Sequence, residues 1–144
     1  MNASAIIPIL NKKKTLFKCY KINKKLYIVI IFGNIKSIDT VRIHDACHTS
    51  EIYNSVKCDC KDQFDNLLEY LKNKNGCIIY TPHEGRGIGL YKKILAYNLQ
   101  YKGINTFDAN IQIGENIDNR CYDELSYIFK DLNLYNRKLN LISN

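Results

Sequence analysis

The sequence contains no run of apolar residues long enough to cross a membrane. A membrane-spanning helix needs roughly 18 or more consecutive apolar residues, and the chain offers no such run. Residues 1–10 also lack the positively charged start of a secretory signal peptide. We therefore expect a cytoplasmic protein that has no membrane partner.

The sequence also lacks the features that divide a chain into several parts. It shows no internal repeat, no low-complexity linker and no domain boundary. Its 144 residues and 46% hydrophobic content suit one domain, whose usual size is roughly 100–150 residues. We expect a single domain over residues 1–144.

Acidic residues are too few to balance the basic ones, and the formal net charge is +7. This charge suits a polyanionic partner such as a nucleic acid, a membrane surface or a nucleotide triphosphate. Many lysines crowd the start of the chain, where such runs are most often a solvated face: Lys12, Lys13, Lys14, Lys18, Lys21, Lys24 and Lys25. The chain lacks the interleaved stacking aromatics of nucleic-acid binders, so we do not expect a nucleic-acid partner.

The hydrophobic pattern predicts a mixed α/β (α+β) domain in which helices flank a mixed sheet. Short apolar or alternating runs predict strands at residues 26–32, 40–44, 77–80 and 138–142. Apolar residues at helical spacing predict helices at residues 62–74, from the glycine-rich loop to about residue 100, and at 122–132. Gly76 stands where a C-terminal cap of the first helix is expected.

Three of the six cysteines form a cluster in the sequence. Without an export signal the thiols are expected to stay reduced, which favours metal binding or catalysis over disulfides. Cys47, Cys58 and Cys60 offer three soft ligands, and three protein ligands leave one position of a tetrahedral zinc site open for water. The alternatives are a closed site completed by His44 or His48, or no metal at all.

The order and spacing of three segments give the most specific signal in the chain. These are residues 42–47 (RIHDAC), residues 57–60 (KCDC) with Gln63, and residues 84–90 (EGRGIGL) followed by Lys93 and Ala96-Tyr97. Together they resemble the GTP cyclohydrolase II family, over residues 41–142. The resemblance implies the fold of that family.

The resemblance also implies a hydrolase that opens the imidazole ring of GTP. C8 leaves as formate and the two outer phosphates leave as pyrophosphate, which gives a diamino-ribosylamino-pyrimidinone phosphate and begins riboflavin synthesis. The implied cofactors are Zn²⁺, held by Cys47, Cys58 and Cys60, and Mg²⁺ bound with the triphosphate. A homodimer is implied as well.

Matched position by position, the resemblance places Tyr97 beside the reacting base. Asp118 matches a proton acceptor and Arg120 a nucleophile toward the α-phosphate, but a guanidinium with a pKa above ~12 is a poor nucleophile. We therefore regard Arg120 equally as a clamp on charge at phosphorus. Without the resemblance, Asp118 at the expected start of a helix would be interpreted as a helix cap. The residues placed around the nucleotide are Arg42, Ile43, His44, Asp45, Ala46, Gln63, Glu84, Gly85, Arg86, Thr106 and Ser143.

The glycine-rich loop also has a physical interpretation of its own. Glu84 can accept hydrogen bonds from a guanine edge, and Arg86 offers a forked donor. The glycines can let backbone N–H groups approach phosphate oxygens. The alternative is a tight turn that needs glycine only for its backbone geometry.

The chain departs from the family pattern at three places. Ala46 replaces a usual glutamate, Pro82-His83 replaces an Arg-Gln pair, and Ser143-Asn144 stands before an expected Asn-Pro-Lys-Lys segment whose lysine helps to bind the nucleotide. One interpretation is a shortened or divergent relative that takes another purine nucleotide or gives a partial product. Others are a segment supplied by another chain, or a catalytically silent nucleotide-binding module. The cysteine triplet argues against the silent module, because a binder needs no open metal site.

Overall fold

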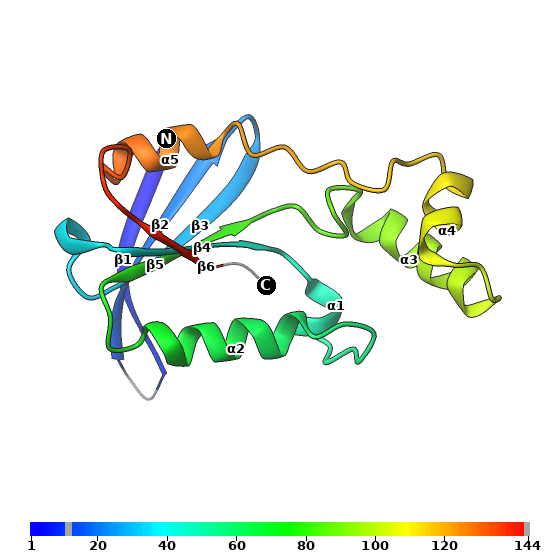
Figure 1. Ribbon diagram of the computed structural model, residues 1–144, viewed down its shortest axis with the longest axis horizontal. Helices are drawn as coiled ribbons and strands as arrows, with labels where there is room; N and C mark the ends of the chain where they lie inside the picture. The colour runs from blue at the N-terminus through cyan, green and yellow to red at the C-terminus, as the bar shows by residue number, and fades with distance from the viewer. Residues whose placement is uncertain (11–12, 143–144) are drawn as a thin grey trace.

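The computed structural model describes residues 1–10 and 13–142, which form a six-stranded sheet with helices on both faces (Figure 1). The strands are β1 (Asn2–Ile9), β2 (Lys13–Ile22), β3 (Lys25–Phe32), β4 (Thr40–Asp45), β5 (Gly76–Thr81) and β6 (Asn140–Ile142). The helices are α1 (His48–Glu51), α2 (Cys60–Leu71), α3 (Gly89–Tyr101), α4 (Thr106–Gln112) and α5 (Leu125–Asp131), with a 3-10 turn at Ile35–Ser37. The predicted mixed α/β domain is confirmed.

The sheet is mixed, and its strand order is β1-β2-β3-β5-β4-β6. The pairs β1/β2, β2/β3 and β3/β5 are antiparallel. Strand β4 runs parallel to both β5 and β6. Asn23 and Lys24, both with positive φ, make the two-residue turn between β2 and β3, as tight hairpins require. The parallel pair β4 and β5 is instead joined through α1 and α2.

Strand β3 is apolar at nearly every position because both of its faces are buried. Val29 and Ile31 pack in the core cluster that α5 covers, while Ile30 and Phe32 pack in the cluster that α2 covers. Figure 1 shows α5 and α2 on opposite faces of the sheet. A strand that is buried on both faces needs apolar residues at successive positions.

Two details of the predicted elements are wrong. The helix expected at residues 122–132 starts only at Leu125, and Gly76 begins β5 instead of capping α2. A Cβ at Gly76 would lie 2.7 Å from Leu71 Cδ2 and 3.0 Å from the Thr40 carbonyl oxygen. This glycine is therefore required by close packing between the end of α2 and β4.

The parallel strands β4 and β5 end side by side. Asp45 pairs with Thr81 in the register, and Ala46 N donates to Thr81 O at 3.1 Å. The segments that follow the two strands, residues 46–48 and 82–89, therefore start from the same edge of the sheet, where α/β proteins commonly bind ligands. Helices α3 and α4 extend away from this edge (Figure 1). No helix in the described ranges is long and apolar enough to span a bilayer.

Candidate active site

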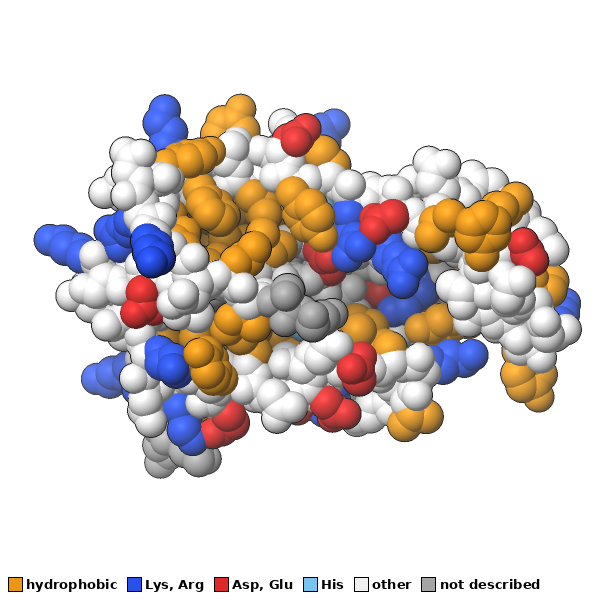
Figure 2. All heavy atoms as spheres, viewed as in Figure 1, with side chains coloured by type: hydrophobic (Ala, Val, Ile, Leu, Met, Phe, Trp, Pro, Cys, Tyr) orange, Lys and Arg blue, Asp and Glu red, His pale blue; other side chains and the backbone are white. Residues whose placement is uncertain are grey.

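A cavity of about 770 Å³ lies at the carboxyl ends of β4 and β5. Its walls come from β4 and the residues after it, the loop before α2 and the start of α2, the loop after β5, helices α3 and α4, Arg120, Tyr122 and the end of β6. Figure 2 shows basic and acidic side chains gathered in the hollow between the sheet and the α3–α4 part. The cavity thus joins segments from most of the chain.

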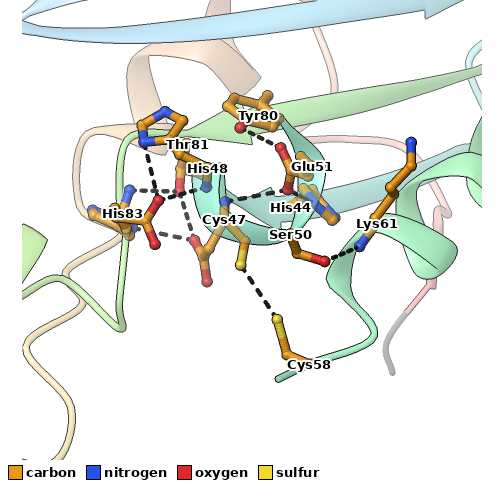
Figure 3. Close-up of polar contacts among 12 residues, drawn as sticks. His44, Cys47, His48, Ser50, Glu51, Cys58, Lys61, Tyr80, Thr81 and His83 are labelled. Carbon is orange, nitrogen blue, oxygen red and sulfur yellow. Dashed lines mark hydrogen bonds and ion pairs between the residues drawn. The ribbon is translucent and has the colours of Figure 1, made fainter. Parts of the chain in front are cut away.

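Three cysteine thiols meet in this cavity, and together with Lys93 we call them the thiol cluster. Cys47 precedes α1, Cys58 lies in the following loop and Cys60 begins α2. The three Sγ atoms lie within 4.8 Å of one another, and those of Cys47 and Cys58 are 3.5 Å apart (Figure 3). This donor set could hold a soft divalent metal ion.

The loop that carries the thiols is tied down by Ser50. The hydroxyl of Ser50 is buried and accepts a hydrogen bond from Lys61 N at 3.1 Å, and Ser50 N donates to Cys47 O at 3.1 Å. These bonds connect the start of α2 to α1. Ser50 therefore links the backbone beside Cys60 to that of Cys47.

Lys93 supplies the positive charge of the thiol cluster. Its buried Nζ donates to Cys47 Sγ at 3.1 Å and to Glu84 Oε1 at 2.7 Å. Burial opposes ionisation of Cys47, but hydrogen bonds, first among them that from Lys93, outweigh it and lower the pKa of this thiol. Burial and the neighbouring thiols raise the pKa of Cys60. A divalent cation would relieve this crowding of like charge, so the donor set fits a metal.

Glu51 supports the thiol cluster from behind. Its Oε1 accepts a hydrogen bond from Cys47 N at 3.2 Å and lies 2.9 Å from His44 Nε2, and Tyr80 OH donates to Oε2 at 2.6 Å. Burial acts against the charged form, yet the bonds from His44 and Tyr80 prevail and lower the pKa of Glu51. Nothing in the sequence marked this carboxylate, because its partners lie on separate elements.

A second group of polar side chains lines the cavity around Asp45, and we call it the Asp45 cluster. Thr81 Oγ1 donates to Asp45 Oδ1, while Tyr122 OH and Arg120 Nη1 donate to Oδ2 at 2.8 and 2.9 Å. His83 also belongs to the cluster, with Nδ1 3.3 Å from Oδ1. Burial would raise the pKa of Asp45, but the bonds from Thr81, Tyr122 and Arg120 lower it overall.

Asp118 and Arg120 form a pair beside this cluster. Arg120 Nε donates to Asp118 Oδ1 at 2.9 Å, which lowers the pKa of Asp118 to about 2, while the same pairing raises the pKa of Arg120. Asp118 is not a helix cap, because α5 begins only at Leu125. A guanidinium held between Asp118 and Asp45 stays charged, which suits a clamp on anionic oxygens.

The glycine-rich loop uses its own backbone donors. Gly87 N and Gly89 N both donate to Glu84 O, at 3.1 and 2.9 Å, so these two N–H groups are not free for phosphate. A Cβ at Gly87 would lie 2.8 Å from both Asn119 C and O. Gly87 is therefore needed for backbone geometry, which was the alternative to phosphate binding in the sequence analysis. Its missing side chain lets the loop contact residues 119–120.

Most of the residues that we predicted from the sequence lie along this one cavity. The exceptions are Glu84, whose carboxylate is buried against Lys93 and His48, and Asp118, which reaches the cavity only through Arg120. Ser143 lies outside the described residues. The lining positions are Arg42, Ile43, His44, Asp45, Ala46, Cys47, Cys58, Cys60, Gln63, Gly85, Arg86, Tyr97, Thr106 and Arg120. Their roles, and a contact of Glu84 with the base, stay predictions.

Several lining residues were not assigned a role from the sequence. Lys93 belonged to the quoted motif, and its place one turn before Tyr97 on a helix was an available signal. Tyr122 was expected as the first residue of a helix, and His83 was noticed only as a departure from the family pattern. Asn110, on α4, carried no signal.

Comparison with known proteins agrees with this geometry. The family model described as GTP cyclohydrolase II matches residues 10–144. A GTP cyclohydrolase-2 of Campylobacter hominis is 39% identical over 88% of this chain and 65% of its own length, and that of Psychromonas ingrahamii is 44% identical over 83% and 60%. The riboflavin biosynthesis protein RibBA of Staphylococcus epidermidis is 41% identical over 81% of this chain and 29% of its own length. The chain thus spans less than two thirds of these relatives. With the match covering nearly all of its residues, it belongs to the GTP cyclohydrolase II family.

Proposed function

We propose that this chain hydrolyses GTP, opening the imidazole ring with release of formate and pyrophosphate, as the first step of riboflavin biosynthesis. One observation carries the proposal: three thiols converge within 4.8 Å in a cavity that the predicted nucleotide-binding residues line. Membership of the GTP cyclohydrolase II family supports it. The names of the relatives supply the substrate and the pathway.

Cys47, Cys58 and Cys60 would hold Zn²⁺, which supplies Lewis-acid activation of water at neutral pH when bound. Lys93 stabilises Cys47 as a thiolate through its 3.1 Å hydrogen bond. Tyr97 stands next to these groups, with Lys93 Nζ 5.7 Å from the centre of its ring. We place the purine base against Tyr97, where the reacting carbon faces the metal ligands.

Arg120 carries the charge that the phosphates need in this proposal. Asp118 and Asp45 orient its guanidinium from two sides, so the side chain is positioned before the nucleotide arrives. It stays protonated and acts as a clamp on negative charge at phosphorus, with Mg²⁺ shielding the rest of the triphosphate. Asp118 then positions Arg120 instead of accepting a proton from it.

Product analysis tests the proposed reaction. The zinc-loaded protein is incubated with GTP, GDP and GMP, and formate, pyrophosphate and the pyrimidine product are measured separately. We expect all three products from GTP, and formate without pyrophosphate from GMP. Nucleotide that is bound and recovered unchanged would identify a silent binding module instead. Formate without pyrophosphate from GTP would identify a partial reaction.

We also propose a cytoplasmic location and a homodimer. All six cysteines are free thiols, which suits a reducing compartment. The homodimer rests on the family resemblance, and sedimentation at several protein concentrations tests it.

A further inference from the structure

His83 has hydrogen-bonding capacity that its neighbours do not use. Its side chain is 5% exposed and lines the cavity. Nδ1 lies 3.3 Å from Asp45 Oδ1 without the geometry of a hydrogen bond, and within residues 1–10 and 13–142 neither ring nitrogen has a hydrogen-bond partner. Buried polar groups nearly always have such a partner. The imidazole is therefore available to a group from outside the chain.

Asp45 does not need His83. Thr81, Tyr122 and Arg120 already donate to its two oxygens, and these bonds include one from a full positive charge. The arrangement around the carboxylate is complete without the imidazole. The hydrogen bonding of Asp45 therefore does not explain why a histidine lies at position 83.

Aromatic packing holds the imidazole in place. The Tyr122 ring meets it edge to face at 5.1 Å between centroids, and the Tyr27 ring does so at 6.5 Å. Tyr27 is fully buried and is not among the residues that line the cavity. Contacts with its faces and edges therefore hold the ring in place, while its two buried nitrogens make no hydrogen bond to the described residues.

The surroundings of His83 favour an anionic ligand group. Arg86 and Arg120 line the same cavity, and Arg120 pairs with the Asp45 carboxylate, the anionic group 3.3 Å from the imidazole. A charge-assisted hydrogen bond to an anionic oxygen is the strongest contact that an imidazole N–H can make here. Either nitrogen can donate, depending on the tautomer.

We infer that His83 is a binding residue whose imidazole donates a hydrogen bond to a phosphate oxygen of the nucleotide. The inference rests on the proposed function, because it takes a purine nucleotide as the ligand. The base lies against Tyr97 and the thiol cluster in that proposal, so the phosphates reach the Asp45 cluster. His83 then adds a donor beside Arg120 that the family resemblance did not assign.

Equilibrium binding to the zinc-loaded full chain tests the inference, with guanosine, GMP and GTP as probes. His83→Phe keeps a ring between Tyr122 and Tyr27 but removes both nitrogens. We expect it to weaken GMP and GTP binding about tenfold, the effect of one lost hydrogen bond to a charged group, and to leave guanosine binding unchanged. His83→Gln, which retains an N–H donor, should restore most of the affinity.

Tyr27→Phe is the matched control, because it removes a buried hydroxyl outside the cavity wall and keeps the ring that packs against His83. It should leave the binding of all three probes unchanged. An equal loss of guanosine and GMP binding in His83→Phe, or no loss at all, would overturn the inference, as would a wild-type protein that binds GMP no better than guanosine. Formate release by the wild type is measured separately, so failure of the proposed reaction is distinguished from failure of the phosphate contact.

Discussion

The thiol cluster and the Asp45 cluster line one cavity and meet at the ends of β4 and β5, yet they differ in charge balance. Asp45 ends β4 and Cys47 follows it, while His83 and Glu84 both follow β5. In the Asp45 cluster one carboxylate meets three hydrogen-bond donors. In the thiol cluster three thiols meet a single ammonium group, and Glu84 shares that group.

This difference indicates what each cluster needs from a ligand. The thiol cluster needs positive charge, because burial and the thiols of Cys58 and Cys47 raise the pKa of Cys60 and oppose its ionisation. The Asp45 cluster is already balanced, and it holds Arg120 in place before any ligand binds. Preorganised charges cost no reorganisation when a substrate arrives. We therefore propose that the first cluster carries the chemistry and that the second binds phosphate.

Removing one thiol should have the largest effect and should affect only the first cluster. We expect Cys58→Ser to abolish both zinc binding and formate release, because two thiols do not form the three-ligand site. Metal analysis and a formate assay measure the two losses. GMP should still bind, since the Asp45 cluster is intact.

The matched control for this change is Cys121→Ser. Cys121 is exposed and does not line the cavity, so zinc content and formate release should stay at wild-type levels. Ring opening by a metal-free Cys58→Ser protein would remove the distinction between the two clusters.

Removing Lys93 should have the next largest effect, on folding as well as on metal binding. Lys93→Met leaves the buried carboxylate of Glu84 without its charged partner, and breaking a buried ion pair costs about 3–5 kcal/mol. Urea unfolding of the zinc-free protein measures this loss. Zinc affinity should also fall, by about 10–100-fold, because Cys47 loses a supporting hydrogen bond.

Two further variants separate charge from packing at this position. Lys93→Met combined with Glu84→Gln should recover part of the stability, because the unpaired charge is then absent. Lys102→Met removes an exposed lysine directly after α3, and it should change stability by less than about 0.5 kcal/mol. A double variant no more stable than Lys93→Met would mean that Glu84 is not the group left unpaired.

A side chain at Gly87 should disturb the Asp45 cluster and spare the thiols. Its φ of 88° is strained for alanine, and the added Cβ would meet the backbone of Asn119. We expect Gly87→Ala to cost about 1–3 kcal/mol in unfolding free energy and to weaken GMP binding by displacing Arg120. Calorimetry and metal analysis should show this with zinc content unchanged.

Gly89→Ala isolates the effect of backbone strain. Its φ of 83° is similar, but no atom lies within 4 Å of the added Cβ. This variant should lose less stability than Gly87→Ala and should bind GMP like the wild type. Equal losses of GMP binding in the two variants would contradict the role given to the contact with Asn119.

Strands β3 to β6 could be predicted from the sequence because their signals are local, whereas β1 and β2 were not among the predicted strands. Strand β3 is apolar at successive positions since α2 and α5 cover its two faces, and β5 shows the same pattern. The thiol cluster was equally accessible, because cysteine is rare and its spacing is informative. The glycine-rich loop was visible as well, although the internal use of its N–H groups was not.

The Asp45 cluster could not be assembled from the sequence. Tyr122 reaches Asp45 across 77 positions of the chain, and its place on the cavity wall depends on α5 starting at Leu125 and not earlier. His83 belongs to no periodic pattern in the sequence and to no motif with a known spacing. Residues that are brought together by tertiary packing leave no local pattern in the sequence. Only the structure therefore revealed that Thr81, Tyr122 and Arg120 donate hydrogen bonds to Asp45, while His83 does not.

The smallest expected effect is a pH dependence that belongs to Asp45 alone. The pKa of Asp45 is lowered from its ordinary value of 3.8 in the folded protein, so its ionised form stabilises the fold. This contribution is fully present above pH 3.8 and is lost as the pH falls through the lower folded value. Asp45→Asn should therefore be less stable than the wild type by about 1–2 kcal/mol at pH 7, and the two proteins should converge as the pH falls below the ordinary value.

Urea unfolding from pH 7 to pH 3 in the presence of a chelator measures this difference without a contribution from metal release. Asp123→Asn changes an exposed carboxylate and should match the wild type at every pH. If Asp45→Asn stayed equally destabilised down to pH 3, its cost would come from lost packing or hydrogen-bond geometry. The Asp45 cluster would then not be held by charge, and the contrast with the thiol cluster would lose its physical basis.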